Sequence, residues 1–297
     1  MAIYKYLSSE RIDVLRDARV RFTQPNALND PFELKPFFKT IFNMETFREK
    51  IRGRMDLRPA ILEKYKELPG EILAMFTPDQ FVQLAMDQME ANKDHFDAIF
   101  DSNMDEMIAA MPALSEKLRA VLHGKLGSGI GILSLSEDSA NDLMWAHYAA
   151  DHSGLVLEFD ETNEFFHRQR SDKDEFFHLR KVNYIGKRLS FESFEQMIDD
   201  ENELFASKLD SWAYEQEWRM LAPLMNRAPE IEAAEPIHLF QFPRAAVSAV
   251  IFGYKSSPAM REEVCSILKS DAAYADVNIL VTYVDLEQGK IAKRPYL

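Results

Sequence analysis

The sequence predicts an α+β protein, with a two-layer core of mixed or antiparallel sheet and a helical insertion. Short apolar runs with the spacing of strands occur near both ends of the 297-residue chain. Between residues 44 and 125, apolar side chains instead recur with the spacing of helices. Both hairpin-length turns and short crossovers join the strand-like runs, so we do not expect a strictly parallel, doubly wound sheet.

Composition and charge limit the class of protein. Hydrophobic residues make up 46% and charged residues 28% of the chain, which is typical of a globular protein with a substantial core. The net charge of −14 repels phosphate, so non-specific binding to nucleic acid is disfavoured. We expect no membrane span and a cytoplasmic location, because the sequence lacks both a long apolar run and a secretory signal. The single cysteine, Cys265, fits a reducing compartment.

Residues 131–160 have the pattern of a strand, a helix and a second strand, and the rest of the chain is arranged around them. Side-chain oxygens at the start of the helical run, including that of Asn141, can cap a helix. The helix then carries Trp145, His147 and Tyr148 within two turns. These groups stack, donate and accept hydrogen bonds, which a helix needs only rarely for core packing. We therefore predict a site here.

The first 33 residues predict a strand, a short helix, a second strand and an ordered turn. The turn spans residues 24–33, where Asn29-Asp30-Pro31 is a strong turn signal. Asn29 and Asp30 can contribute to a site, or they can bond only to the local backbone. The sequence leaves both alternatives open.

The helical periodicity defines the expected domains. Residues 1–43 and 126–297 are expected to form the α+β core, and residues 44–125 a helical insertion that prolines such as Pro59, Pro78 and Pro112 divide into several helices. Its apolar stripes indicate a core or an interface. After residue 160 we expect loops at 161–178 and 226–236, helices at 189–209 and 258–269, and strands at 182–185, 217–221, 237–240, 249–253 and 277–285.

Three polar groupings lie at the edges of predicted strands, where side chains can point into a cleft. They are Tyr4-Lys5-Tyr6 with Asn29-Asp30-Pro31-Phe32-Glu33; Ser134 and Ser136 with Trp145, His147 and Tyr148; and Tyr214-Glu215-Gln216-Glu217-Trp218-Arg219. A carboxylate facing aromatic and hydroxyl groups can bind a ribose hydroxyl or stabilise a cationic sugar. The alternative is structural: Glu217 and Arg219 form a salt bridge, and Trp145 belongs to the core.

Several segments of the chain, taken in their order along the sequence, resemble an uncharacterised bacterial family, domain of unknown function 2971. The segments are YKYLSSERIDVLRDARVRFTQPNALNDPFE, SLSEDSANDLMWAHYAADHSGLVLEFD, VNYIG, SWAYEQEWRM and VIFG, of which NDPFE and YEQEWR are the specific parts. The resemblance covers nearly the whole chain apart from the helical block. It brings no established reaction, and it leaves phage defence, toxicity and housekeeping open as biological roles.

The order of the three groupings also resembles, more distantly, the ADP-ribosyltransferase fold. That fold implies NAD as a possible substrate, and we expect no metal. On its opening strand the fold has a histidine or arginine that binds NAD. This chain has neither residue in Tyr4-Lys5-Tyr6, and Lys5 is the nearest substitute for that role. The resemblance implies catalytic roles for Glu217, Glu215 and Tyr148, and NAD-binding or supporting roles for Lys5, Tyr6, Asn29, Asp30, Ser134, Ser136, Trp145, His147 and Arg219.

Within that resemblance, Glu217 would hold the ribose hydroxyl and stabilise the oxocarbenium-like state, while Glu215 would orient an unknown acceptor. Lys5 would contact the ribose or phosphates, and Tyr6, Trp145 or Tyr148 would stack on nicotinamide. A one-residue register shift would exchange the glutamate that faces the cleft, so the choice between Glu215 and Glu217 stays open.

Two other functions are consistent with the sequence. A non-enzymatic sensor or interaction module would use the helical block to bind a protein partner, and an exposed apolar patch there would favour it. A metal-dependent hydrolase or nuclease would use carboxylates, which suit magnesium. Its candidate residues are Asp30, Glu33, His147, Glu215 and Glu217.

Overall fold

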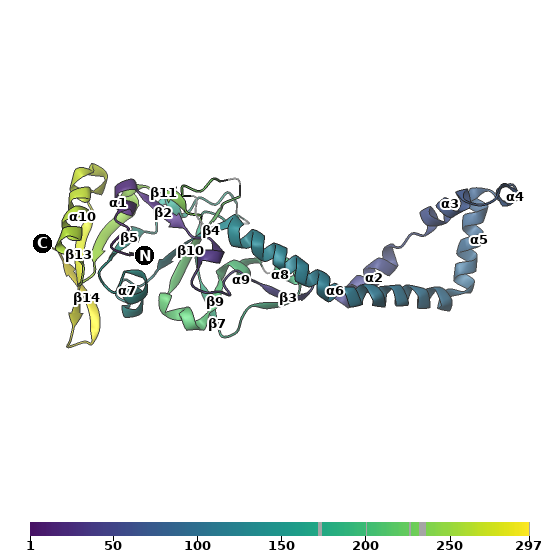
Figure 1. The fold of residues 1–297 in the computed structure, drawn as a ribbon, viewed down its shortest axis with the longest axis horizontal. Coiled ribbons are helices and arrows are strands. Elements are labelled where there is room, and N and C mark those ends of the chain that lie inside the picture. The colour runs from purple at the N-terminus through teal and green to yellow at the C-terminus, as the bar shows by residue number, and fades with distance from the viewer. Residues whose placement is uncertain (172–173, 200, 226, 232–235, 297) are drawn as a thin grey trace. The chain divides into compact units, whose positions relative to one another are not determined.

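The computed structural model describes residues 1–171, 174–199, 201–225, 227–231 and 236–296 (Figure 1). The chain forms two compact units. The core unit comprises Met1–Pro36, Val121–Leu189 and Asp200–Leu297, and the helical unit comprises Phe37–Ala120 and Ser190–Asp199. Among the described residues, no helix is both long enough and apolar enough to span a membrane.

The core unit contains an eight-stranded mixed sheet. In spatial order the strands are β14 (Lys290–Pro295), β13 (Asn278–Asp285), β12 (Val247–Phe252), β5 (Leu155–Asp160), β1 (Ala2–Leu7), β4 (Ile130–Ser136), β10 (Glu217–Pro223) and β6 (Leu179–Lys181). Neighbouring strands are antiparallel, except that β12 and β13 are parallel. The α+β class and the mixed sheet predicted from the sequence are confirmed.

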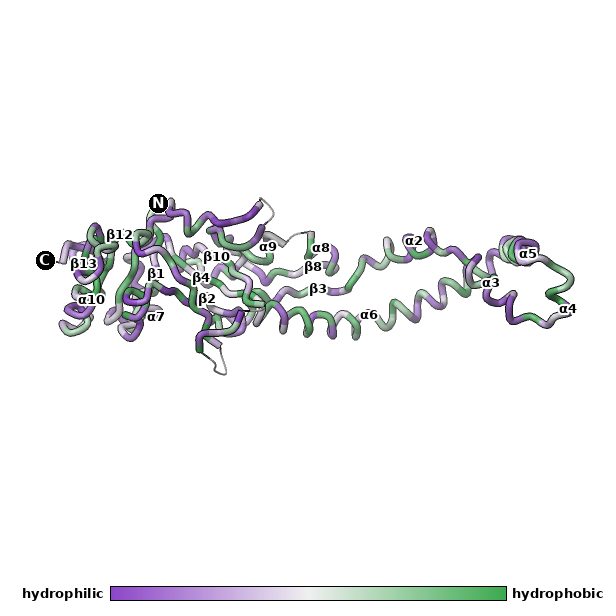
Figure 2. Tube along the Cα trace, turned by 90° about the horizontal axis from the view of Figure 1, so that it is seen from above, coloured by the Kyte–Doolittle hydropathy of each residue, from purple (hydrophilic) through white to green (hydrophobic). Residues whose placement is uncertain are grey.

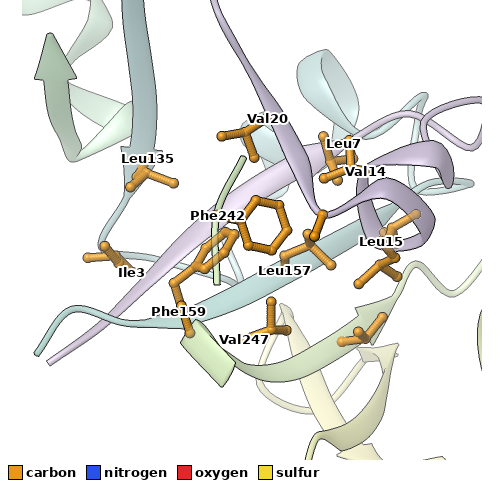
Figure 3. Packing of buried hydrophobic residues seen from close by; sticks show 14 of the residues in the cluster. Ile3, Leu7, Val14, Leu15, Val20, Leu135, Leu157, Phe159, Phe242 and Val247 are labelled. Atoms are coloured by element: carbon orange, nitrogen blue, oxygen red, sulfur yellow. The ribbon is translucent and has the colours of Figure 1, made fainter. Parts of the chain in front are cut away.

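One face of the sheet carries the main hydrophobic core. The helices α1 (Asp13–Asp17) and α10 (Pro258–Ser270) cover it, together with the strand pair β2 (Arg19–Phe22) and β11 (His238–Gln241). Strand alternation sends Ile3 and Leu7 of β1, and Leu157 and Phe159 of β5, toward this core, where Phe242 meets Phe159 (Figure 3). Burial of these side chains is the main force that holds the face together.

The opposite face of the sheet is covered by α7 (Asp142–Tyr148). The side chain of Asn141 caps this helix by accepting a hydrogen bond from the backbone N–H of Met144 at 3.2 Å, as the sequence predicted. Met144 and Trp145 pack against Tyr6 of β1. The chain then turns back tightly at Gly154, where a Cβ would lie 2.1 Å from the carbonyl oxygen of Leu7. Only glycine fits this approach.

The remaining elements of the core unit are short. They are η1 (Pro25–Ala27), η2 (Glu164–Phe166), β7 (Asn183–Ile185), α9 (Glu201–Ala206), β9 (Ser207–Leu209), η3 (Asp210–Glu215), η4 (Arg244–Ala246) and η5 (Ala272–Tyr274). β7 and β9 pair in parallel. The loop expected at 226–236 lies partly outside the described residues.

The helix predicted over residues 189–209 is wrong. This stretch forms β8 (Ser190–Ser193), α8 (Phe194–Asp199), α9 and β9, and residue 200 is not described. β8 pairs in parallel with β3 (Phe37–Thr40), so its alternating side chains follow a strand. Ser193 then caps α8 by accepting a hydrogen bond from the backbone N–H of Gln196 at 3.2 Å.

The helical unit contains α2 (Met44–Arg54), α3 (Arg58–Lys66), α4 (Gly70–Leu73), α5 (Pro78–Ala91) and most of α6 (Lys93–Gly129), besides β3, β8 and α8. Figure 2 shows hydrophilic and hydrophobic residues alternating along α6. Pro112 lies inside α6 and does not end it, contrary to expectation. The unit's limits differ from the predicted 44–125 because β3 precedes α2, and β8 with α8 comes from a distant part of the chain.

Candidate active site

A cavity lies in the core unit where β1 and β4 diverge. In the described strands these neighbours share one register pair, Tyr4 with Ser136, whereas β1 pairs with β5 along its whole length. The cavity has a volume of about 250 Å³. Its lining includes these residues expected from the sequence to form a site: Lys5, Tyr6, Asn29, Ser134, Tyr148, Glu215 and Glu217.

Three buried carboxylates surround two buried cations at one wall of this cavity. Lys208 Nζ lies 2.6 Å from Glu215 Oε2, 3.1 Å from Glu217 Oε2 and 3.5 Å from Glu33 Oε2. Arg219 Nη2 bonds to Glu33 Oε1 and lies 2.9 Å from Glu217 Oε2. We call these five residues the ion cluster. Each cation bridges carboxylates from separate segments, so the cluster joins the turn after β2 to β9 and β10.

The ion cluster shifts the pKa values of two of its carboxylates, Glu217 and Glu33, in opposite directions. Burial disfavours a charged carboxylate, but the adjacent Arg219 and Lys208 outweigh this and lower the pKa of Glu217 to about 2. For Glu33, burial dominates and the negative charge of Glu217 adds to it, so its pKa is raised despite the same cations. Glu217 is therefore the carboxylate that the cluster holds ionised at neutral pH.

Glu217 presents an oxygen that the protein does not use. Its Oε2 is bound by both cations, while Oε1 is buried and has no partner at hydrogen-bond distance among the described residues. The neighbouring Ser134 hydroxyl also helps to lower the pKa of Glu217. The backbone N–H of Glu217 donates to the hydroxyl of Tyr184 at 2.8 Å, which fixes the start of β10. A buried acceptor of this kind, in the lining of a cavity, can receive a hydrogen bond from a ligand hydroxyl.

Glu215 is held differently, since both of its oxygens have protein partners. The hydroxyl of Tyr148 donates to Oε1 at 2.5 Å, and Lys208 occupies Oε2. Asn29 Nδ2 in turn donates to the Tyr148 hydroxyl at 3.2 Å. Burial, followed by the bond to Glu215, raises the pKa of Tyr148, so this hydroxyl stays protonated. Glu215 therefore positions Tyr148 at the cavity.

The backbone explains how both glutamates reach the same cavity. Glu215 ends η3, and Gln216 follows it with a φ of 44°, in the left-handed region. β10 begins directly afterwards at Glu217, which is in register with Ser136 of β4. The Ser136 hydroxyl donates to the carbonyl oxygen of Glu215 at 2.7 Å and stabilises this turn.

Two further cations, Lys5 and Arg21, line the cavity. Lys5 Nζ donates to the carbonyl oxygen of Ser134 at 2.9 Å. Burial is the largest influence on this ammonium and lowers the pKa of Lys5 to about 8. An amine with a pKa this close to neutral can carry charge or give up a proton near physiological pH.

Five residues expected in the site do not line the cavity. Asp30 is buried and accepts a hydrogen bond from the backbone N–H of Phe32 at 2.8 Å, so it shapes the turn. Ser136 and Arg219 support the glutamates from behind. The expectation that Trp145 stacks on a ligand is corrected: it is 0% exposed, and its Nε1 donates to the carbonyl of Ser139. His147 is exposed and lies by the Tyr214 hydroxyl at 3.2 Å.

Sequence reasoning did not assign site roles to Arg21 or Lys208, and it included Glu33 in the first polar grouping and as a candidate metal ligand, but not among the NAD-site residues. Alternation in Arg19–Phe22 separates the arginines from the buried Val20 and Phe22, and this was the available signal for Arg21. Lys208 had no such signal, because its partners come from distant segments. Within the described part of the chain, no group of three or more His, Cys, Asp or Glu side chains is placed to hold a metal ion.

Comparison with known proteins relates one segment of the chain to a family. No curated protein and no solved structure has significant similarity to the chain. Residues 144–220 match the model of a family described as a protein of unknown function, DUF2971. The matched segment begins in α7 and ends in β10, and it contributes Tyr148, Lys208, Glu215 and Glu217 to the cavity. This match supports the DUF2971 family that the sequence motifs predicted.

Proposed function

We propose that the cavity binds NAD and that the protein transfers or hydrolyses its ADP-ribosyl group. The observation that carries this proposal is Glu217, an ionised carboxylate at the cavity with one buried oxygen unused by the protein. A ribose hydroxyl would donate to that oxygen. The cavity of about 250 Å³ suits the nicotinamide and its ribose, with the rest of NAD extending outward.

The distant resemblance to the ADP-ribosyltransferase fold is part of this proposal. In that fold NAD would lie in a cleft between strand layers, and here the cavity lies beside β1 and β4, whose described register is limited to Tyr4 with Ser136. Tyr148 lines the cavity and would stack on nicotinamide in place of the fully buried Trp145; Tyr6 also lines it but is only 6% exposed. Lys5 lies on the opening strand and lines the cavity, where it would contact ribose or phosphate.

The reaction begins as the bond between ribose C1′ and the nicotinamide nitrogen breaks. The electron pair of that bond leaves with nicotinamide and neutralises its positive charge, while C1′ becomes cationic. The fixed negative charge of Glu217 stabilises this cation more than the ground state, which lowers the barrier. Water or an acceptor group then bonds to C1′ and releases a proton. The Tyr148–Glu215 pair is placed to orient that nucleophile.

The test is release of nicotinamide from NAD by the purified protein, with and without cell extract as a source of acceptors. Glu217→Gln keeps the shape of the side chain but removes its charge, so release should fall by about a hundredfold or more. Glu10→Gln, an exposed glutamate of the core unit, serves as the matched control and should have no effect. Equal release by wild type and Glu217→Gln would refute the role of Glu217. Absence of both NAD binding and release in the wild type would refute the function.

A second candidate function is a protein-interaction module that uses the helical unit. Large apolar side chains of this unit are exposed, which is unusual enough to suggest a partner. They include Met75 at 71%, Leu84 at 44%, Ile99 at 45% and Leu114 at 50% exposed. Leu84 lies on α5, and Ile99 and Leu114 lie on α6, where hydrophobic and hydrophilic residues follow one another along the chain (Figure 2).

This candidate predicts a complex that depends on the helical unit. The wild type and a Leu84→Glu/Leu114→Glu variant would be compared by sedimentation, alone and with cell extract. A complex formed by the wild type and lost in the variant, with NAD turnover absent in both, favours the interaction module. Identical sedimentation of the two proteins under both conditions would contradict it.

A further inference from the structure

Lys5 and Arg21 differ from Lys208 and Arg219 because, among the described residues, no carboxylate lies within ion-pair distance of either side chain. Lys208 and Arg219 each contact two or more carboxylates. In contrast, neither Lys5 nor Arg21 forms an ion pair with any residue in the described ranges, although both line the cavity. Two cationic side chains thus face the same cavity with their charges available.

Arg21 also has a donor without an acceptor. Its Nε is buried and makes no hydrogen bond within the described part of the chain. The neighbouring Arg19 lies two residues earlier on β2, and its guanidinium pairs with Asp17 at 3.2 Å. An unpaired buried donor costs free energy, which a bound acceptor would recover. The difference between the two arginines therefore distinguishes a cavity residue from a surface residue.

The surroundings of Lys5 indicate the sign of the missing partner. Burial contributes most to its lowered pKa; among the surrounding charges Glu217 acts most strongly and raises the pKa, while Arg11 and Arg21 lower it. Because Lys5 and Arg21 line the same cavity, an anion bound between them would reduce the repulsion of their positive charges. Phosphate is the anion that best matches a guanidinium, because the planar fork donates two parallel hydrogen bonds to it.

We infer that Arg21 and Lys5 form an anion subsite that binds the phosphate groups of the nucleotide. This rests on the proposed function, since the subsite shares its cavity with Glu217. The ligand must then carry both a hydroxyl-bearing sugar and a phosphate. A nucleotide such as NAD or ADP-ribose satisfies both contacts, whereas nicotinamide riboside, which has no phosphate, satisfies only one.

The experiment measures binding by calorimetry of ADP-ribose, nicotinamide riboside and inorganic pyrophosphate. Arg21→Gln should weaken ADP-ribose and pyrophosphate binding by about tenfold to a hundredfold, the usual loss of a charged hydrogen bond, and leave nicotinamide riboside unchanged. Arg19→Gln is the matched control and should bind all three ligands as the wild type does. Lys5→Met is a second, independent variant with the same expected selectivity, in case Arg21→Gln does not fold.

The outcomes separate this inference from the proposed function. Pyrophosphate binding that depends on Arg21, without NAD turnover, would support the subsite and refute the NAD reaction. NAD turnover and ADP-ribose binding that are unchanged in Arg21→Gln would refute the subsite and leave the reaction standing. Equal weakening of ADP-ribose and nicotinamide riboside in both variants would also refute the subsite, because the loss would not involve phosphate.

Discussion

Replacing Lys208 by methionine tests whether the ion cluster holds the cavity together. Methionine keeps most of the length of the side chain but removes the ammonium that contacts Glu33, Glu215 and Glu217. The Lys208 side chain is only 8% exposed, so water cannot replace it easily. Among the described residues, Arg219 would then be the one cation left to Glu33 and Glu217, and Glu215 would keep only its bond from Tyr148. The mutual repulsion of the three carboxylates can be relieved by taking up a proton or by opening the cavity wall.

The expected magnitude follows from the burial of the partners. The side chains of Glu33 and Glu217 are each 2% exposed, and that of Glu215 is 6% exposed. Removing one partner of a buried ion pair typically costs about 3–5 kcal/mol, because the remaining charge loses its compensation. Since Arg219 still compensates part of the charge, we expect Lys208→Met to lower the free energy of unfolding by about 3 kcal/mol.

The assay is urea unfolding followed by tryptophan fluorescence. The three tryptophans are Trp145, Trp212 and Trp218, and all belong to the core unit, so the signal reports that unit. Lys181→Met is the control, since Lys181 pairs with Glu137 at 2.8 Å while 56% exposed. An exposed pair of this kind contributes about 0–1 kcal/mol.

The reasoning would be refuted if Lys208→Met and Lys181→Met changed the unfolding free energy equally. A second comparison identifies the cause of the loss. Adding Glu215→Gln to Lys208→Met removes one of the carboxylates that lost its partner, so it should restore part of the stability. If the double variant were less stable than Lys208→Met by the full effect of Glu215→Gln alone, charge repulsion would not be the reason.

Four further predictions follow from the structure. Affinity for ADP-ribose should fall as pH rises through about 8, because Lys5 is charged below its lowered pKa and neutral above it. Calorimetric titrations at several pH values check this, and the affinity of Lys5→Met should not depend on pH in this range. Glu33→Gln should destabilise less than Glu217→Gln at pH 7 in the fluorescence assay, because the raised pKa of Glu33 shows that the folded state disfavours its charge, whereas the lowered pKa of Glu217 shows that the folded state favours its charge. The reverse order would contradict this assignment. Gly154→Ala should lower the unfolding free energy by about 1–3 kcal/mol, since its Cβ would lie 2.1 Å from a carbonyl oxygen. Gly53→Ala meets nothing within 4 Å and should stabilise α2 by about 0.5–1 kcal/mol, as circular dichroism can measure.

The central elements of the core unit were predictable from local sequence. Asn141 lies where a cap is needed, and residues 155–159 are apolar except for Glu158 because β5 is buried on both faces. The apolar spacing in residues 189–209 fits a helix. The first residues of this segment nevertheless form β8, because they pair with β3. β3 itself was not predicted. A strand whose partner lies far along the chain leaves little local signal.

The candidate site was predictable where strands order its residues, and unpredictable where distant segments meet. Lys5 and Glu217 lie on strands at the divergence of the sheet, so their polar character within apolar runs indicated a cleft. Lys208 follows a helix and precedes η3, and its importance comes from carboxylates brought together by folding. Trp145 shows the opposite error. α7 is short and carries Trp145, His147 and Tyr148, so its sequence alone does not indicate which of these rings packs against the sheet.

Stability alone does not account for an ion cluster at this position. Buried ion pairs can often be replaced by apolar side chains of similar volume without loss of stability, because desolvation offsets much of their attraction. Apolar side chains in place of Lys208 and Arg219 could fill the same volume, but no cation would then stabilise the ionised form of Glu217. The two cations lower its pKa through Oε2 and leave Oε1 unused by the protein. We infer that the cluster presents a fixed negative charge to the cavity, which Lys5 and Arg21 also line. A ligand that carries a developing cation at one end and phosphate at the other matches both.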